Sequence, residues 1–294
     1  MQTNTKILAP EFEYLAPKTI DEALDLLDKY KDKNVKILAG GTDLLVKMKT
    51  SDLKIDYLIN IKNITELNFI DTTDGLKIGA VTPLSHIIRE EKVKMKYSAL
   101  YEAIDSMAAP AIRNMGTMAG NLGNASPAAD TVPPLIAYGA KVKLQSKRGE
   151  RTVLVEDFIT GVGKTIIKPD EMISEIIIPE INKNTGSAFL KKSRVKADLS
   201  KINCAIYLER KDNICKECKL VFGSVAIKVL RVEKAENLLK GQIVNSELIN
   251  KAAEEAACEI KPINDIRSTA EYRMAMSKIT LKDGFELAWA RAKN

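Results

Sequence analysis

Glycines and short polar side chains gather in one stretch of the chain, residues 108–130. Glycines permit close approach to the backbone, and short hydroxyl, amide and carboxylate groups form directional hydrogen bonds. The stretch has few large apolar residues and no helical or strand period, so we expect a long irregular segment. Such a segment in a compact domain is typically functional or disordered, and its lack of charge argues against disorder. It could present N–H groups to an anion and side chains to a polar ligand, although an ordinary surface loop also fits this composition.

A second stretch has the residue types of a phosphate-binding turn. Residues 35–39 read as a short buried strand, Gly40 and Gly41 follow, and a helix is expected over residues 44–48. A strand, a double glycine and a helix start is a geometry that delivers free N–H groups to a phosphate. Alone it also fits a plain strand-to-helix turn, and it lacks the three glycines of the dinucleotide fingerprint.

Together the two stretches resemble the FAD-binding subunit of the molybdenum hydroxylases, the group that includes xanthine dehydrogenase, nicotinate dehydrogenase and carbon monoxide dehydrogenase. The similar motifs follow one another in the expected order along essentially the whole chain, at residues 39–43, 78–82, 112–114, 117–121, 125–130 and 265–273.

The resemblance implies an α+β fold with two domains. The first is a PCMH-type (vanillyl-alcohol-oxidase-like) FAD-binding domain, residues 1–181, made of two α/β subdomains at about residues 1–60 and 61–181. The second, residues 187–294, is a C-terminal α+β domain like that of carbon monoxide dehydrogenase flavoproteins, with a three-stranded antiparallel sheet and helices. Residues 182–186 read as the linker.

Periodicity and capping signals predict the elements that would position these residues. Thr19 and Glu22 form a capping box at the start of the first helix, and Asp74-Gly75 marks a tight hairpin turn. The expected helices cover residues 19–30, 44–48, 83–91, 97–107, 131–137, 230–239, 246–259 and 268–292. The expected strands cover residues 35–39, 55–61, the hairpin 68–80, 140–145, 151–155, 171–178, 187–192, 203–210 and 219–226.

The resemblance also implies which residues contact FAD. The first stretch would wrap the pyrophosphate through its backbone, because a Cβ at Gly40 or Gly41 would block that approach; its residues are Ile37, Leu38, Ala39, Gly40, Gly41, Thr42, Asp43 and Leu44. The second stretch would contribute Ala108, Thr117, Gly120, Asn121, Asn124, Ser126 and Asp130. Asp130 is negative, so we expect it to bond a ribose hydroxyl rather than a phosphate.

Two further residues are implied at the flavin ring. Ile173 would pack on the ring, and Lys191 would lie near its pyrimidine end, where a cation stabilises the reduced flavin and raises its potential. Lys192 is adjacent, which leaves the register open by one residue. A core isoleucine and a solvated lysine are the alternatives.

The chain offers little other chemistry. Cys215 and Cys218 form a C-x-x-C pair without further ligands at comparable spacing, so we expect incidental thiols and no metal site. The only histidine, His86, reads as a packed or surface residue, and we assign no catalytic residue to this chain. Residues 161–165 look like the end of a Walker loop, but Phe158 stands where that motif needs glycine, which excludes nucleotide hydrolysis.

The composition of the chain indicates which kinds of partner and which cellular compartment to expect. The net charge of +6 is spread out and only 5% of residues are aromatic, which argues against nucleic-acid binding. No apolar run approaches the length of a membrane span, and residues 1–6 lack the features of a signal peptide. We therefore expect a cytoplasmic protein.

The resemblance implies a place in a complex. The molybdenum cofactor and [2Fe-2S] clusters would lie on partner subunits, and this chain's FAD would pass electrons to NAD(P)+ or another acceptor. The Gly-Gly-Thr-Asp sequence at residues 40–43 favours enzymes that hydroxylate an N-heterocycle over those that oxidise carbon monoxide. The N-heterocycle would be nicotinate or a purine such as xanthine. The charge-poor segments Ala108–Pro110 and Ala125–Ala129 are expected at the protein interface.

Two other classes of function remain open from the sequence. One is a stand-alone FAD oxidoreductase of the same fold group, although the C-terminal domain is short and contains no histidine to act as a base. The other is a non-catalytic assembly protein that uses FAD as a structural support.

Overall fold

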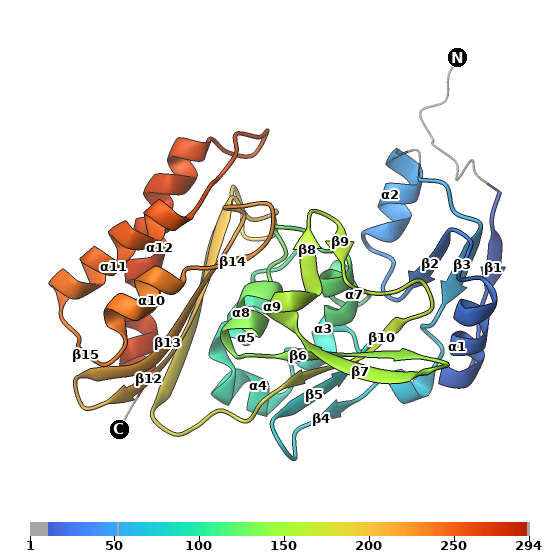
Figure 1. Cartoon of the computed structure of the whole chain (residues 1–294), viewed down its shortest axis with the longest axis horizontal. Coiled ribbons are helices and arrows are strands. Elements are labelled where there is room, and N and C mark those ends of the chain that lie inside the picture. Colours follow the sequence, from blue (N-terminus) through green and yellow to red (C-terminus); the bar gives the residue numbers. More distant parts are fainter. Residues whose placement is uncertain (1–10, 52, 293–294) are drawn as a thin grey trace.

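The computed structural model describes residues 11–51 and 53–292 as three units in a row (Figure 1). The first ten and last two residues of the predicted domains, and with them the segment examined for a signal peptide, lie outside the described residues. In Figure 1 the N-terminal unit is blue, the central unit is mostly green and the C-terminal unit runs from yellow to red.

The N-terminal unit is a small parallel sheet with strand order β1-β3-β2. Parallel strands need crossover connections, which α1 and α2 supply. Thr19 caps α1 as predicted, its hydroxyl accepting a hydrogen bond of 3.2 Å from the Glu22 amide. The elements are β1 (Glu13–Leu15), α1 (Ile20–Lys29), β2 (Val35–Leu38), α2 (Leu44–Thr50) and β3 (Tyr57–Asn60).

The central unit is a five-stranded antiparallel sheet in the order β4-β5-β10-β6-β7, with helices packed against it. The predicted hairpins at 68–80 and 140–155 form, and Gly75 turns the first of them with a φ of +77°. The strands are β4 (Ile70–Asp71), β5 (Leu76–Gly79), β6 (Lys141–Ser146), β7 (Gly149–Leu154) and β10 (Met172–Ile178), with a separate hairpin of β8 (Ile159–Gly161) and β9 (Lys164–Thr165). The helices are η1 (Thr65–Leu67), α3 (Leu84–Ile87), α4 (Glu91–Lys96), α5 (Ser98–Asp105), α6 (Pro110–Arg113), α7 (Met118–Gly123), α8 (Val132–Ala137) and α9 (Val155–Phe158).

The expectation that residues 108–130 are irregular was wrong, because α6 and α7 lie within them. Pro110 begins α6, and the Thr117 hydroxyl caps α7 by accepting a bond of 3.0 Å from the Gly120 amide. Each helix is too short to show a period, and α7 buries only one narrow face through Met118 and Leu122. A cap and tertiary packing, rather than helix propensity, therefore hold α7, whereas α6 has no side-chain cap and buries no residue.

The C-terminal unit begins with the predicted antiparallel sheet, here β11-β12-β13 extended by two short strands. Residues 230–231 pair with β13, so the helix expected from residue 230 begins at Glu233. The elements are β11 (Thr185–Lys192), β12 (Ile202–Lys211), β13 (Ile214–Gly223), β14 (Leu230–Arg231), α10 (Glu233–Leu239), β15 (Gln242–Ile243), α11 (Ser246–Glu259) and α12 (Ala270–Arg291).

The C-terminal sheet is buried on both faces and joins the two domains. Alternate residues of β11 and β12 point to opposite sides: Phe189 and Ala205 pack in the core of the central unit, while Ala188 and Ile206 pack against the C-terminal helices. The residues on this sheet are therefore held rigidly against the central helices α5 and α8.

Candidate functional site

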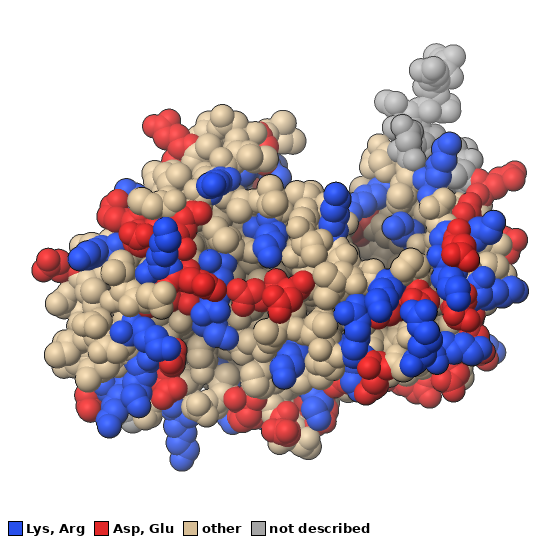
Figure 2. Space-filling view, viewed as in Figure 1, with Lys and Arg blue, Asp and Glu red and all other residues tan. Residues whose placement is uncertain are grey.

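The two stretches singled out in the sequence meet in the structure. A Cβ built on Gly40 would lie 2.4 Å from the Met115 carbonyl oxygen and 2.8 Å from the Gly116 Cα, so the two backbones are in direct contact. Beyond this contact Lys47 of α2 donates a hydrogen bond to the side-chain oxygen of Asn124. In Figure 2 the surface is hollowed between the N-terminal unit and the centre of the molecule, where α2 faces α7 in Figure 1. We call this hollow the notch.

The structure changes the reason why residues 40 and 41 are glycines. At Gly40 a side chain would strike the second stretch rather than a ligand. Gly41 has a φ of +81°, and a Cβ there would lie 2.9 Å from Leu38 Cδ1 and 3.2 Å from Leu45 Cδ1. The glycines are required to bring the two stretches together and to turn the chain into α2.

Backbone donors without acceptors lie at the notch. Among the described residues, the amide groups of Gly41, Thr42 and Asp43 have no hydrogen-bond acceptor, and the Asp43 side chain does not cap α2. In the second stretch the amide of Ala119 also lacks an acceptor in the part of the chain that the structure describes, whereas the Met118 amide faces the Thr82 carbonyl in an isolated antiparallel bridge. Free N–H groups on two facing segments suit a ligand with several negatively charged oxygens, such as the pyrophosphate of FAD.

The other polar residues of the second stretch hold its shape. The side-chain oxygen of Asn121 accepts a bond of 2.7 Å from the Thr131 hydroxyl, and the Ser126 hydroxyl accepts one of 3.2 Å from the Ala128 amide. Their amide nitrogen and hydroxyl hydrogen remain available to a ligand.

Two alanines at the ends of this segment have left-handed backbone conformations. Ala108 has a φ of +47° and Ala125 a φ of +48°, which is strained for a residue with a Cβ. Arg113 holds the first of them by donating to the carbonyl of Ala108 at 2.8 Å and to that of Met107 at the same distance. The conformation of the second stretch therefore includes two strained backbone positions.

Ile173, expected at the flavin ring, lies beside α7 of the second stretch. It is on β10, buried, and its Cδ1 lies 3.6 Å from a Cβ built on Gly123 of α7. Gly120 and Gly123 are themselves exposed. The side chain belongs to the core of the central unit, as the alternative of a core isoleucine describes, and its contact with a flavin ring stays a prediction.

Asp130 and Lys191 form a buried ion pair at the junction of the two domains. The Lys191 ammonium lies 2.7 Å from Asp130 Oδ2 and donates to the Ser106 carbonyl at 3.0 Å; the two charged side chains are 4% and 5% exposed. Burial raises the pKa of Asp130, and Lys191 and Asn203 oppose that rise. Lys191 rather than Lys192 therefore makes this contact. Each carboxylate oxygen of Asp130 accepts a bond from within the protein, which leaves the expected ribose contact without support.

Asn203 is a residue that the sequence reasoning missed. Its amide nitrogen donates to Asp130 Oδ1 at 2.8 Å, and its own oxygen is buried without a partner among the described residues. A Cβ on Gly223 would lie 2.2 Å from that oxygen, so glycine makes room for the amide. The available signal was one asparagine within the apolar run of β12, since a buried amide needs a polar partner.

The late motif, residues 265–273, is a structural clamp. Arg273 is 3% exposed and donates to Asp265 at 2.7 Å and to the Ser224 carbonyl at 3.2 Å. Burial of Asp265 opposes ionisation, but hydrogen bonds from Arg273 and Arg267 hold the pKa of Asp265 below its usual value. This motif ties the start of α12 to the end of β13.

The predicted protein interface was wrong in its second half. Ala109 and Pro110 are exposed, but Ala125, Ala128 and Ala129 are at most 5% exposed. Their small side chains fit the turns that follow α7 and pack within the molecule, so they offer no surface to a partner.

The remaining candidates stay outside the notch. His86 is an exposed residue of α3. Cys215 and Cys218 lie buried in β13, where the neighbouring Cys215 thiol and burial raise the pKa of Cys218. Within residues 11–51 and 53–292 there is no cluster of three potential metal ligands and no helix long and apolar enough to cross a membrane.

Comparison with known proteins places both domains. Residues 10–181 match the family described as the FAD binding domain in molybdopterin dehydrogenase, and residues 187–288 match the carbon monoxide dehydrogenase flavoprotein C-terminal domain. The carbon monoxide dehydrogenase medium chain of Hydrogenophaga pseudoflava is 32% identical over 97% of this chain and 99% of its own length. The nicotinate dehydrogenase FAD-subunit of Eubacterium barkeri is 33% identical over 81% of this chain and 82% of its own length.

Solved structures agree with these matches. A structure of the Hydrogenophaga pseudoflava carbon monoxide dehydrogenase that lacks the Mo-pyranopterin moiety of the molybdenum cofactor superposes with a TM-score of 0.92 at 33% identity. The superposition covers 96% of this chain and 98% of that one. Relatives that act on different substrates are similar to this chain to nearly the same degree.

Proposed function

This chain belongs to the FAD-binding medium subunits of the molybdenum hydroxylases, and we propose that it binds FAD in the notch between α2 and α7 and uses it to transfer electrons. Electrons would arrive from iron–sulfur clusters on a partner subunit and leave to NAD(P)+ or another acceptor. The family consists of oxidoreductase subunits, and its FAD-binding domain accounts for residues 10–181 of this chain.

The observation that carries this proposal is the meeting of the two stretches. Gly40 contacts the second stretch directly, and both segments contain amide donors without acceptors among the described residues. In the proposal Gly41, Thr42 and Asp43 donate to one side of the pyrophosphate, and Ala119 donates from the other. Hydrogen bonds to charged oxygens contribute about 1.5–3 kcal/mol each, so a few such donors would hold a dinucleotide.

Lys191 and Ile173 would act on the flavin ring. Ile173 offers an apolar surface beside the exposed glycines of α7. Lys191 is a buried cation whose position is fixed by Asp130 and by the Ser106 carbonyl. A cation held near the ring would favour the reduced form of the bound flavin, which is the usual way in which a protein tunes this cofactor. Bound FAD supplies the capacity to accept and release electrons.

The substrate and the acceptor of the whole enzyme are part of the proposal. The Gly-Gly-Thr-Asp turn at residues 40–43 favours an enzyme that hydroxylates an N-heterocycle, either nicotinate or a purine such as xanthine. The nicotinate dehydrogenase FAD-subunit of Eubacterium barkeri and the xanthine dehydrogenase FAD-binding subunit of Escherichia coli O157:H7, which is 29% identical, are relatives with such names.

Co-purification tests the proposed place in a complex. The tagged chain, purified from its host, should retain a larger molybdenum-containing subunit and a small iron–sulfur subunit, and the complex should hydroxylate xanthine or nicotinate. The chain alone, loaded with FAD, should reduce dyes with NAD(P)H but should not hydroxylate either heterocycle. Recovery of a lone monomer that oxidises an organic substrate by itself would refute the assignment.

A further inference from the structure

A second cavity lies between the two domains, away from the candidate FAD site. Its volume is about 420 Å³, and none of its lining residues belongs to residues 37–44 or 108–130. The ends of α4 and α5 form one wall, the start of β11 with β12 forms the other, and Arg291 near the end of α12 reaches in. Ligand sites are commonly found at such domain junctions and in this range of volume.

The cavity carries an excess of positive charge. Lys96 lies 2.7 Å from Glu180, which also pairs with Lys92, and Arg291 pairs with Glu102 at 2.5 Å. Lys94 also lines the cavity, and it has no carboxylate within ion-pairing distance among the described residues. The charged residues that line the cavity are Lys94, Lys96, Arg291 and Glu102, so the local charge suits a ligand with one or two negative charges.

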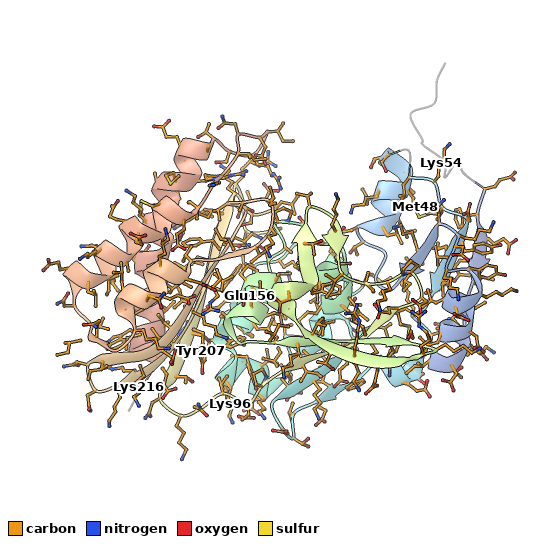
Figure 3. The ribbon with its side chains drawn as sticks, viewed as in Figure 1. Met48, Lys54, Lys96, Glu156, Tyr207 and Lys216 are labelled. Carbon is orange, nitrogen blue, oxygen red and sulfur yellow. The ribbon has the colours of Figure 1, made fainter. Side chains whose placement is uncertain are left out.

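Two tyrosine side chains line the same cavity. Tyr101 and Tyr207 are both half-buried and come from opposite walls. The ring of Tyr207 stands edge-on to Tyr138 at 5.8 Å between centroids, which fixes its orientation. Figure 3 shows Tyr207 on the C-terminal sheet and Lys96 on the helices of the central unit, at the junction between the two domains. Flat rings beside an unpaired ammonium suit a planar ring that carries an acidic group.

We propose that this cavity binds a small aromatic anion, with its ring between Tyr101 and Tyr207 and its anionic group at Lys94. An aromatic carboxylate and a nucleoside monophosphate share this chemistry, and both are small enough for a cavity of about 420 Å³. The hydroxyls of Ser98 and Tyr101 have no hydrogen-bond partner within the described ranges, so they are free to bond the ligand.

Binding there would connect the two domains. Arg291 donates to the Ser187 carbonyl at 2.7 Å and holds the start of β11 against Glu102 of α5. A ligand between these elements contacts residues on both sides of the linker. Because it binds only the folded protein, it should raise the unfolding temperature, and the rise should grow with the logarithm of ligand concentration above its Kd.

Titration calorimetry on the FAD-loaded chain tests the proposal, with benzoate and adenosine monophosphate as the probes. We expect saturable binding of at least one of them, and the stronger probe identifies which anion class the cavity prefers. Lys94→Gln should weaken that binding about two- to fivefold, the range of one partly exposed charge contact. Ser98→Phe should fill the cavity and abolish binding.

A matched control is Lys216→Gln, which makes the same charge change on an exposed residue of β13 and should leave binding unchanged. All variants should retain FAD like the parent, so a failure here is distinguishable from a failure of the FAD assignment. The proposal is overturned if neither probe binds. It is equally overturned if Lys94→Gln leaves the affinity of a bound probe at the parent value.

Discussion

Replacing Lys191 by methionine should destabilise the protein far more than replacing its neighbour. Lys191 and Asp130 are almost completely buried, 2.7 Å apart, and Asn203 is the other side chain that bonds the carboxylate. Lys191→Met keeps the length of the side chain but leaves a carboxylate buried without its cation. Removing one partner of a buried ion pair typically costs about 3–5 kcal/mol of unfolding free energy.

A double variant separates the pair from the packing around it. Lys191→Met combined with Asp130→Asn removes both charges, and replacing a buried pair by neutral groups is often nearly neutral. We therefore expect the double variant to recover most of the stability that the single variant loses. Lys192→Met is the matched control; it has no ion-pair partner among the described residues and should change stability by less than about 0.5 kcal/mol.

Urea unfolding of the FAD-free chain measures these differences. Trp289 packs against the core of the C-terminal unit and reports its unfolding by fluorescence. Circular dichroism of the same samples reports the whole chain, and coincident curves justify a single free energy for each variant. The reasoning is refuted if Lys191→Met costs no more than Lys192→Met, or if the double variant is no more stable than the single one.

Two further predictions concern the contact between Gly40 and the second stretch and the loss of stability at acid pH. Gly40→Ala should lower the free energy of unfolding by about 1–3 kcal/mol, because its Cβ meets the backbone of Met115. It should also weaken FAD binding in a fluorescence titration. The control Gly161→Ala, whose Cβ would approach only Lys164 at 3.9 Å, should change neither stability nor FAD binding. Hydrogen bonds from Lys92 and Lys96 lower the pKa of Glu180 from 4.5 to about 2, so its contribution is present above pH 4.5 and is lost as the pH falls through 2. In Glu180→Gln, the free energy of unfolding, measured by thermal denaturation, should vary less with pH across that window than it does in the parent. The difference should be no more than about 1 kcal/mol, because the side chain is 37% exposed. An unchanged pH dependence would contradict this.

The sequence predicted the longer elements well because their signals are local. The capping box at Thr19, the Asp74-Gly75 turn and the apolar period of α11 each act within a few residues. The helices α6 and α7 were not predicted, because a helix of one or two turns is too short to show a period in its apolar residues. The formation of α7 depends on the cap at Thr117 and on burial against β10 of the central sheet, whereas α6 begins at Pro110 and buries no residue.

The two stretches of the candidate site could be found from the sequence, but the contacts that their residues make could not. The two glycine-rich stretches were found from composition and spacing, and they do meet. That Gly40 touches Met115 rather than leaving room for a ligand, and that Lys191 pairs with Asp130 rather than standing alone, depends on residues 61 or more positions apart. Asn203 was hidden for the same reason, since only the fold shows that β12 runs behind the second stretch.

The amount of FAD that the isolated chain retains tests the central claim most directly. The chain is purified with FAD supplied, passed through a desalting column, and its flavin absorbance is compared with its protein concentration. The account predicts equimolar FAD in the parent and a clear loss in Gly40→Ala, with Gly161→Ala behaving like the parent. A folded parent chain without a flavin absorbance band would contradict it.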